Sequence, residues 1–224
     1  MGQQTARTAS RAPQLASALI AAAVLAACGG GGGAEDAAQP KPSQPHIVDA
    51  APTLTHLLAI GNSITRHPPL SEIGWTNDWG MAASERSKDW AHVAGVALAV
   101  PVTAINAADL ERDPNASVPA FPVTPTSAVV IELGDNGMPA RYSEILAAVK
   151  DAAKLACTST YWHTVDRDAQ IKAACEAAGG AYVFIGDIFS GPLGLFSHPG
   201  IDAHPGDVQM AEIARRVVAA LGSR

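Results

Sequence analysis

Five short apolar runs, each followed by a polar turn or an amphipathic stretch, constrain the fold of this chain more than any other feature. They lie at residues 54–60, 100–105, 128–133, 155–162 and 181–185. Most of them lack polar alternation, which is the pattern of strands buried on both faces. Amphipathic stretches fill the gaps at residues 90–99, 139–154, 166–178 and 207–221. This alternation predicts a mainly parallel sheet of about five strands with helices on both faces.

The first 27 residues have the pattern of an export signal. Arg7 and Arg11 supply a positive region, and the apolar stretch at residues 15–27 is short for a membrane span. The sequence Leu-Ala-Ala-Cys that ends at Cys28 resembles the lipobox of bacterial lipoproteins, in which the cysteine is lipidated. We therefore expect a protein exported to the cell envelope and anchored through Cys28, at the periplasmic face or in the outer membrane. The alternative is an ordinary signal peptide with an unmodified cysteine.

Residues 28–52 form a glycine run followed by a proline-rich polar stretch. Such a segment cannot bury apolar surface and is predicted to be a tether. The folded domain is expected to span residues 53–224, and the hydrophobic content of 48% is enough for one core. The formal net charge of -6 leaves no basic face for a phosphate backbone, so nucleic acid is not expected as a partner. We expect a monomer.

Two cysteines remain if Cys28 carries lipid. Cys157 lies in a predicted strand, and Cys175 lies near the end of the following predicted helix. An even pair in an exported protein favours a disulfide. Two buried free thiols are the alternative, because sequence does not establish the geometry of a bridge.

Three polar turns follow or flank the predicted elements where functional groups gather in such folds, beyond the carboxyl ends of the strands. Ser63 follows the first apolar run, Asn136 follows the third, and His204 precedes the last helix. A hydroxyl, an amide and an imidazole are the groups that a nucleophile, an oxyanion donor and a general base require. Helix capping, turn chemistry and a loop stop explain each of them separately. Their shared placement favours a catalytic site.

The segments AIGNSIT, ELGDNG and DAHPGDVQMAEIA resemble the first, third and fifth blocks of the SGNH, or GDSL-like, hydrolases. The resemblance implies a three-layer α/β/α, flavodoxin-like domain over residues 54–224. It implies that Ser63 is the nucleophile and His204 the general base. The side-chain amide of Asn136 and the backbone N–H of Ser63 would stabilise the oxyanion. The family's second block usually adds a glycine N–H, for which the nearest candidate here is Ala108.

Two positions depart from the family's pattern. Asn62 stands where the family usually has the aspartate of Gly-Asp-Ser, which keeps hydrogen bonding and loses a charge. Ile201 stands where the family usually has the aspartate that orients the histidine. Either Asp202 orients His204 from a shifted loop, or the serine and histidine act as a dyad with a backbone carbonyl as the orienting group.

Trp75 and Trp79 lie among glycines and polar residues close to Ser63 in the sequence. We expect them to line the substrate pocket against an acyl group or a sugar ring, with core packing as the alternative. The histidines show no zinc-type spacing, and no glycine-rich nucleotide motif is present, so neither a metal nor a cofactor is expected.

These residues together predict a serine esterase. It would hydrolyse a carboxylic ester, such as an acetylated carbohydrate, a lipid or a small ester, through an acyl-enzyme. One alternative is an O-acyltransferase that uses the same site and passes the acyl group to a sugar hydroxyl. Another is a non-catalytic envelope lipoprotein that retains the fold.

Overall fold

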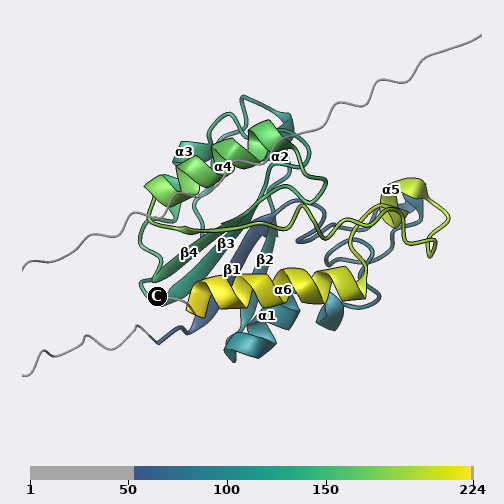
Figure 1. The fold of residues 1–224 in the computed structure, drawn as a ribbon, viewed down its shortest axis with the longest axis horizontal. Helices are drawn as coiled ribbons and strands as arrows, with labels where there is room; N and C mark the ends of the chain where they lie inside the picture. Colours follow the sequence, from purple (N-terminus) through teal and green to yellow (C-terminus); the bar gives the residue numbers. More distant parts are fainter. Residues whose placement is uncertain (1–52, 223–224) are drawn as a thin grey trace, which may run out of the picture. The chain divides into compact units, whose positions relative to one another are not determined.

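The computed structural model describes residues 53–222. The expected signal peptide of residues 1–27, Cys28 and the tether of residues 28–52 lie outside the described residues. Within residues 53–222 the strands form one parallel sheet in the order β2-β1-β3-β4-β5 (Figure 1). The strands are β1 His56–Gly61, β2 Val102–Asn106, β3 Ser127–Glu132, β4 Lys154–Thr158 and β5 Ala181–Val183. The predicted parallel sheet is therefore confirmed.

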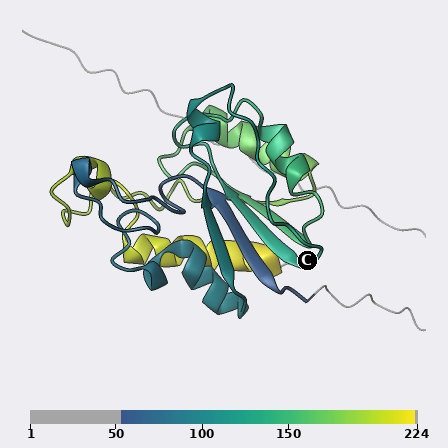
Figure 2. The same cartoon turned by 180° about the vertical axis from the view of Figure 1, so that it is seen from behind.

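Helices pack against both faces of the sheet. They are α1 Trp90–Leu98, α2 Asp109–Arg112, α3 Tyr142–Ala148, α4 Val165–Ala177, α5 Pro199–Asp202 and α6 Asp207–Gly222. Figures 1 and 2 show α1 and α6 on one face, and α2, α3 and α4 on the other. Two short 3-10 helices, Ser71–Ile73 and Arg86–Lys88, lie in the loop between β1 and α1. The three-layer α/β/α prediction is confirmed, and among residues 53–222 no helix is long and apolar enough to cross a bilayer.

Successive residues of β1 enter two separate hydrophobic clusters. Leu57 and Ala59 pack with residues of α1 and α6, whereas Leu58 and Ile60 pack with residues of α3 and α4. All four side chains are fully buried. Because side chains alternate between the two faces of a strand, a strand covered on both sides has to be apolar throughout. Each such leucine or isoleucine contributes roughly 2 kcal/mol through burial.

Two elements are shorter than predicted. The apolar run at residues 155–162 gives a strand that ends at Thr158. Beyond it the backbone N–H of Tyr161 donates to the carboxylate of Asp135 over 2.9 Å, so the chain turns toward the end of β3. The helix predicted at residues 139–154 is limited to α3, because its last residues form a turn and then enter β4.

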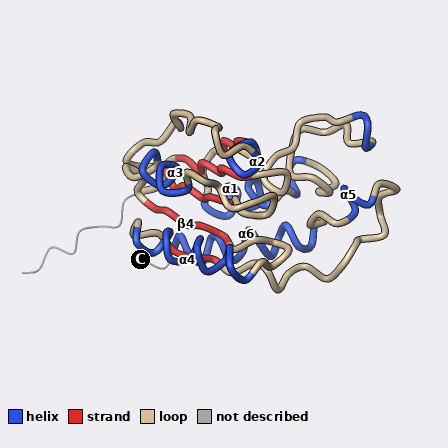
Figure 3. The backbone as a smooth tube through the Cα atoms, turned by 90° about the horizontal axis from the view of Figure 1, so that it is seen from above, coloured by secondary structure: helices blue, strands red, loops and turns tan. Residues whose placement is uncertain are grey.

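The short helix α5 has no counterpart among the predicted elements. His198 caps its N-terminus by accepting the backbone N–H of Gly200, and Pro199 occupies the first helical turn, where a missing N–H costs nothing. Figure 3 shows α5 among long loops at one end of the domain. This helix matters for the site because it lies immediately before His204.

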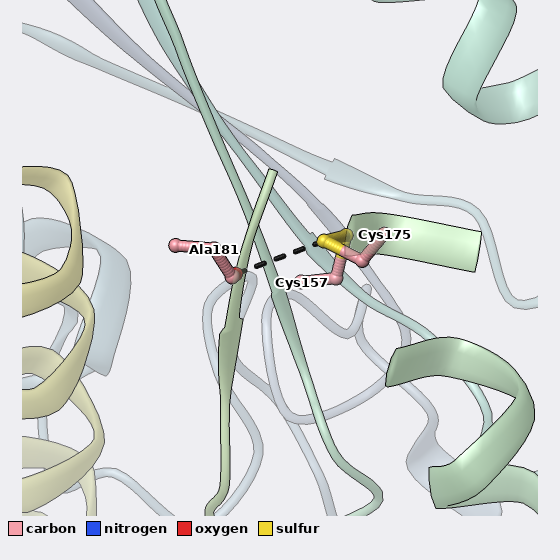
Figure 4. The surroundings of a disulfide bond; sticks show 3 residues. All are labelled: Cys157, Cys175 and Ala181. Carbon is pink, nitrogen blue, oxygen red and sulfur yellow. Dashed lines mark hydrogen bonds between the residues drawn. A yellow bond between two sulfur atoms is a disulfide. The ribbon is translucent and has the colours of Figure 1, made fainter. Parts of the chain in front are cut away.

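A disulfide joins Cys157 of β4 to Cys175 of α4 (Figure 4). Of the two arrangements that the sequence left open, the structure has the bridge. The Cα atoms are 6.1 Å apart, which is within the range that a disulfide spans. The bond fastens α4 to the sheet, and an added Cβ at Gly180 would lie 2.7 Å from the Cys175 sulfur, so a side chain at position 180 would not fit.

Candidate active site

Ser63 lies at the point where the winding of the sheet changes direction. The chain leaves β1 to form β2 on one side, and β3 lies on the other side of β1. In open parallel sheets, ligands bind outside the carboxyl ends of the strands at such a switch point. Glu132, the last residue of β3, is in register with Gly61, the last residue of β1. The segments that follow these two strands therefore meet at one edge of the sheet.

The structure brings Ser63 and His204 into direct contact. The Ser63 Oγ lies 2.8 Å from the His204 Nε2, and the His204 Nδ1 lies 2.6 Å from the backbone oxygen of Gly200. A carbonyl oxygen can only accept, so the proton of a neutral imidazole has to be on Nδ1. The Nε2 lone pair then faces the serine hydroxyl, which donates to it. This is the arrangement of a general base beside a nucleophile.

The electrostatic surroundings keep His204 neutral. Its pKa is lowered to about 4, mainly by burial; the hydrogen bond to the Gly200 carbonyl opposes this shift, and the nearby His67 contributes to it. A histidine with this pKa is unprotonated throughout the neutral range. His204 is therefore in the state that accepts a proton.

Asp202 does not orient His204, which corrects one of the two sequence-based alternatives. Its carboxylate instead accepts the backbone N–H groups of Gly194, Leu195 and Phe196 at 2.7 to 2.9 Å. These bonds lower the pKa of Asp202, with the Phe196 N–H as the largest cause. The geometry matches the other alternative, in which a backbone carbonyl orients the imidazole. Asp202 fixes the loop before α5.

Asn136 belongs to a hydrogen-bond network centred on Glu111 of α2. Its Nδ2 donates to the Glu111 carboxylate over 2.5 Å, and Arg112 donates to its Oδ1 over 3.2 Å. Glu111 also accepts the backbone N–H of Gly134 and, at 3.3 Å, the side-chain amide of Asn62. An amide carries two N–H donors. The second N–H of Asn136 has no partner among the described residues, so it is available to a ligand.

The backbone donor expected at Ala108 is already used. Its N–H donates to the Asn106 Oδ1 over 3.0 Å, within the turn after β2. The interpretation of Ala108 as an oxyanion donor is thus corrected by this internal bond. The backbone N–H of Ser63, in contrast, donates to no group among residues 53–222. The oxyanion donors that the geometry leaves open are the Ser63 N–H and the Asn136 amide.

Trp75 is part of a small hydrophobic cluster, which corrects its interpretation as a pocket wall. It is 2% exposed and packs with Met81 and Ile201. Its Nε1 donates to the backbone oxygen of His67 over 3.0 Å. The cluster holds the segment after Ser63 against α5 and thereby supports the Gly200 carbonyl.

Trp79 contacts Ala83 and Trp75. Its Nε1 donates to the backbone oxygen of Ala83, and its ring meets that of Trp75 edge to face, with centroids 6.1 Å apart. It lines a polar cavity of about 230 Å³ together with Arg66 and Asp78. Neither Ser63 nor His204 lines that cavity. The proposed pocket role of Trp79 stays a prediction.

The aromatic ring beside the base is Trp162, which follows β4. Its centroid is 5.2 Å from that of the His204 ring, with the planes at 89°. Tyr161 meets Trp162 on one side and Phe189 on the other, both edge to face. The partly exposed Trp162 indole offers an apolar surface next to the reacting atoms.

Three side chains at the site were not predicted from the sequence: Glu111, Glu132 and Trp162. Glu132 carries the one available signal, since it is an acid that ends an apolar run, and a buried carboxyl group requires partners. Glu111 and Trp162 lie in segments whose composition indicates nothing specific. Only the tertiary structure brings them to the nucleophile.

Comparisons with known proteins give weak likenesses. No protein-family model and no curated protein matches the sequence. A solved structure described as a family two carbohydrate esterase from Cellvibrio japonicus has 18% identity and a TM-score of 0.49. The alignment covers 78% of this chain and 62% of that one, so this chain spans less than two thirds of its length. A second solved structure has 12% identity and a TM-score of 0.45 over 78% of this chain and 99% of that chain.

Proposed function

We propose that this protein is a serine esterase that hydrolyses a carboxylic ester through an acyl-enzyme on Ser63. The observation that carries the proposal is the 2.8 Å contact between the Ser63 Oγ and the Nε2 of His204. The hydrogen bond from His204 Nδ1 to Gly200 adds to it, because it fixes the tautomer in which Nε2 accepts. If Ser63 and His204 met only by chance, nothing would require His204 to have the tautomer in which its Nε2 accepts a hydrogen bond.

Acylation follows from this arrangement. His204 takes the Ser63 proton as Oγ attacks the ester carbonyl, and the imidazolium is stabilised by its Nδ1–H bond to Gly200. The oxyanion accepts hydrogen bonds from the Ser63 backbone N–H and the free N–H of Asn136. One such donor contributes about 3 kcal/mol in the transition state. His204 then gives its proton to the leaving alcohol.

Deacylation uses the same groups. Water enters beside His204, loses a proton to Nε2 and attacks the acyl-enzyme, which releases the acid and restores Ser63. The proposed substrates are a small ester or an acylated glycan, with the acyl group or a sugar ring against Trp162. An O-acyltransferase would differ only in the acceptor, a sugar hydroxyl in place of water.

The proposal includes export and attachment to the bacterial cell envelope through a lipidated Cys28. The Cys157–Cys175 disulfide supports an oxidising compartment, because such bonds persist outside the cytosol. The anchor would hold the domain at the membrane while residues 28–52 act as its tether. We propose that the protein acts as a monomer.

Hydrolysis of a short-chain chromogenic ester by the full chain in detergent tests this function. We expect Ser63→Ala to lower kcat/KM by about a thousandfold or more, because the nucleophile is lost. Ser71→Ala, which alters an exposed serine in the same loop, is the matched control and should keep full activity. Equal rates for Ser63→Ala and the parent would contradict the proposal. Product formation only when a sugar acceptor is added would favour the acyltransferase.

A further inference from the structure

Three carboxylates surround the side chain of Asn62, the residue before the nucleophile. Its Nδ2 lies 3.3 Å from an oxygen of Glu111, 3.4 Å from one of Glu132 and 3.5 Å from one of Asp135. Asn62 is fully buried, and its Oδ1 accepts the backbone N–H of Ile64 over 3.0 Å. One amide therefore faces three acids with only two N–H donors.

Glu132 is the most confined of these acids. It is fully buried, and its Oε2 accepts the hydroxyl of Thr65 over 2.9 Å and the backbone N–H of Asn62 over 3.3 Å. These donors come from the residue directly before Ser63 and from the residue two positions after it. An added Cβ at Gly61 would lie 2.7 Å from this oxygen, so the start of the nucleophile turn is packed directly against Glu132.

The charged groups around the cluster do not neutralise Glu132. Arg112 of α2 donates to the Asn136 side chain, and Arg167 of α4 donates to the backbone oxygens of Gly134 and Asp135. The hydroxyl of Tyr142, from α3, is buried without a hydrogen-bond partner among the described residues. The Glu132 carboxyl thus lies beside two other acids. Among residues 53–222, no cationic side chain is paired with it.

This environment favours a protonated Glu132. Burial raises its pKa well above the usual range, and the charges of Asp135 and Glu111 raise it further. Burial also raises the pKa of Asp135, while its hydrogen bond with Glu132 opposes that shift. Two carboxyl groups that share one buried site cannot both ionise readily, so one keeps a proton and donates it to the other.

We propose that Glu132 and Asp135 share one proton, and that Glu132 acts through Asn62 and Thr65 as the positioning residue of the Ser63 turn. The importance of this positioning role for catalysis rests on the proposed esterase function. The same cluster of acids explains why Asn62 replaces the aspartate of Gly-Asp-Ser in this chain. An aspartate would add a fourth carboxylate and remove the two amide donors that the existing acids use. Residues 53–222 contain no group of His, Cys, Asp and Glu side chains suited to hold a metal ion.

The first test compares kcat and KM across pH for Glu132→Gln and Asn62→Asp in the full chain. An amide is a neutral replacement for a protonated carboxyl, so Glu132→Gln should keep kcat within about threefold at pH 6. The parent should lose kcat at alkaline pH as the shared proton leaves, and Glu132→Gln should not. Asn62→Asp should lose kcat by about tenfold or more at pH 7, with KM nearly unchanged and partial recovery at lower pH. Glu144→Gln, an exposed acid of α3, is the matched control and should follow the parent.

The second test measures unfolding by urea in a Ser63→Ala background, which removes the need for activity. Native Glu132 keeps a proton that the unfolded chain releases above a pKa of about 4.5, so stability falls as pH rises from there toward the native pKa. Between pH 5 and pH 8 the unfolding constant should rise about tenfold or more beyond the rise seen with Glu132→Gln, because only Glu132 holds a proton in the native chain that the unfolded chain releases.

A third measurement needs no variant that might fail to fold. Carbon-13 NMR of the side-chain carboxyls at pH 7 should show one buried glutamate at the position of a protonated acid. All glutamates ionised at pH 7, or equal pH slopes with and without Glu132→Gln, would overturn the inference. Absence of esterase activity in the parent with the slope difference retained would refute the proposed function and leave the shared proton supported.

Discussion

Asp202 and Glu132 are both buried acids near the Ser63–His204 pair, yet their surroundings favour opposite charge states. Asp202 accepts three backbone N–H groups, which lower its pKa. Glu132 lies among two other carboxylates in a fully buried position, which raises its pKa. The comparison shows that three backbone N–H donors lower the pKa of one buried acid, whereas burial, followed by the charges of two neighbouring acids, raises the pKa of the other. Asp202 fixes the loop of the base, and Glu132 lies against the turn of the nucleophile.

The largest effect is expected at His204, which contacts Ser63. His204→Ala should lower kcat/KM by about a thousandfold or more, because the general base is lost. Steady-state kinetics on the same ester measure the effect. Substitutions of Asp202 and Glu132 should each cause a smaller loss than this one. His56→Ala, at the first residue of β1 and so at the opposite edge of the sheet from Ser63, is the matched histidine control and should retain most of the activity.

The next largest effect is expected for Asp202→Ala. The change leaves three backbone N–H groups without their acceptor, so the loop before α5 and the Gly200 carbonyl should shift. We expect kcat to fall by about tenfold to a hundredfold, by analogy with the effect of misplacing a catalytic group. Asp202→Asn should lose less, because one side-chain oxygen still accepts two of the bonds. A loss equal to that of His204→Ala would mean that Asp202 acts directly on the imidazole.

The fall of kcat/KM at low pH tests whether Asp202 acts on the imidazole of His204. Protonated His204 cannot accept the serine proton, so kcat/KM should stay level from pH 7 to pH 5 and fall near pH 4, the pKa of His204. Asp202→Asn should leave this limb in place, because the carboxylate does not touch the ring. A shift of this limb to lower pH in Asp202→Asn would mean that the negative charge of Asp202 raises the pKa of His204. That result would contradict the separate roles of the two acids.

The smallest effect on activity is expected at the disulfide, which fastens α4 to the sheet. Cys157→Ser combined with Cys175→Ser should leave kcat near that of the parent. The free energy of unfolding should fall by about 3 kcal/mol, as expected for a loop of this length. Urea unfolding and ester hydrolysis on the same preparation measure the two quantities. A large loss of kcat in the folded variant would show that α4 affects the site.

The fold was predictable from the sequence because its signals are local. β1 is buried on both faces and is therefore apolar throughout, and α6 has a clear apolar side. The end of β4 was not predictable, because Tyr161 and Trp162, which follow two small polar residues after Thr158, have the aromatic side chains typical of strands. They leave the sheet only because Asp135, distant in sequence, accepts their N–H groups.

The site was predictable only in part for the same reason. Ser63, Asn136 and His204 stand in short motifs at strand ends, and the structure brings Ser63 and His204 into contact and connects Asn136 through Glu111 to Asn62. The role of Asp202 depended on which way its side chain points, which the one residue between Asp202 and His204 does not determine. Trp75 lies among glycines and polar residues in the sequence, which favoured a pocket wall. Tertiary packing instead buries it against α5.

The central claim is that Ser63 is a nucleophile activated by neutral His204. Labelling of the full chain with a fluorophosphonate at pH 7, followed by peptide mass spectrometry, tests it most directly, because the reagent reacts with an activated serine and needs no knowledge of the natural ester. The account predicts one adduct, on the peptide that contains Ser63, and its absence in His204→Ala. No adduct on Ser63, or equal labelling in His204→Ala, would contradict it.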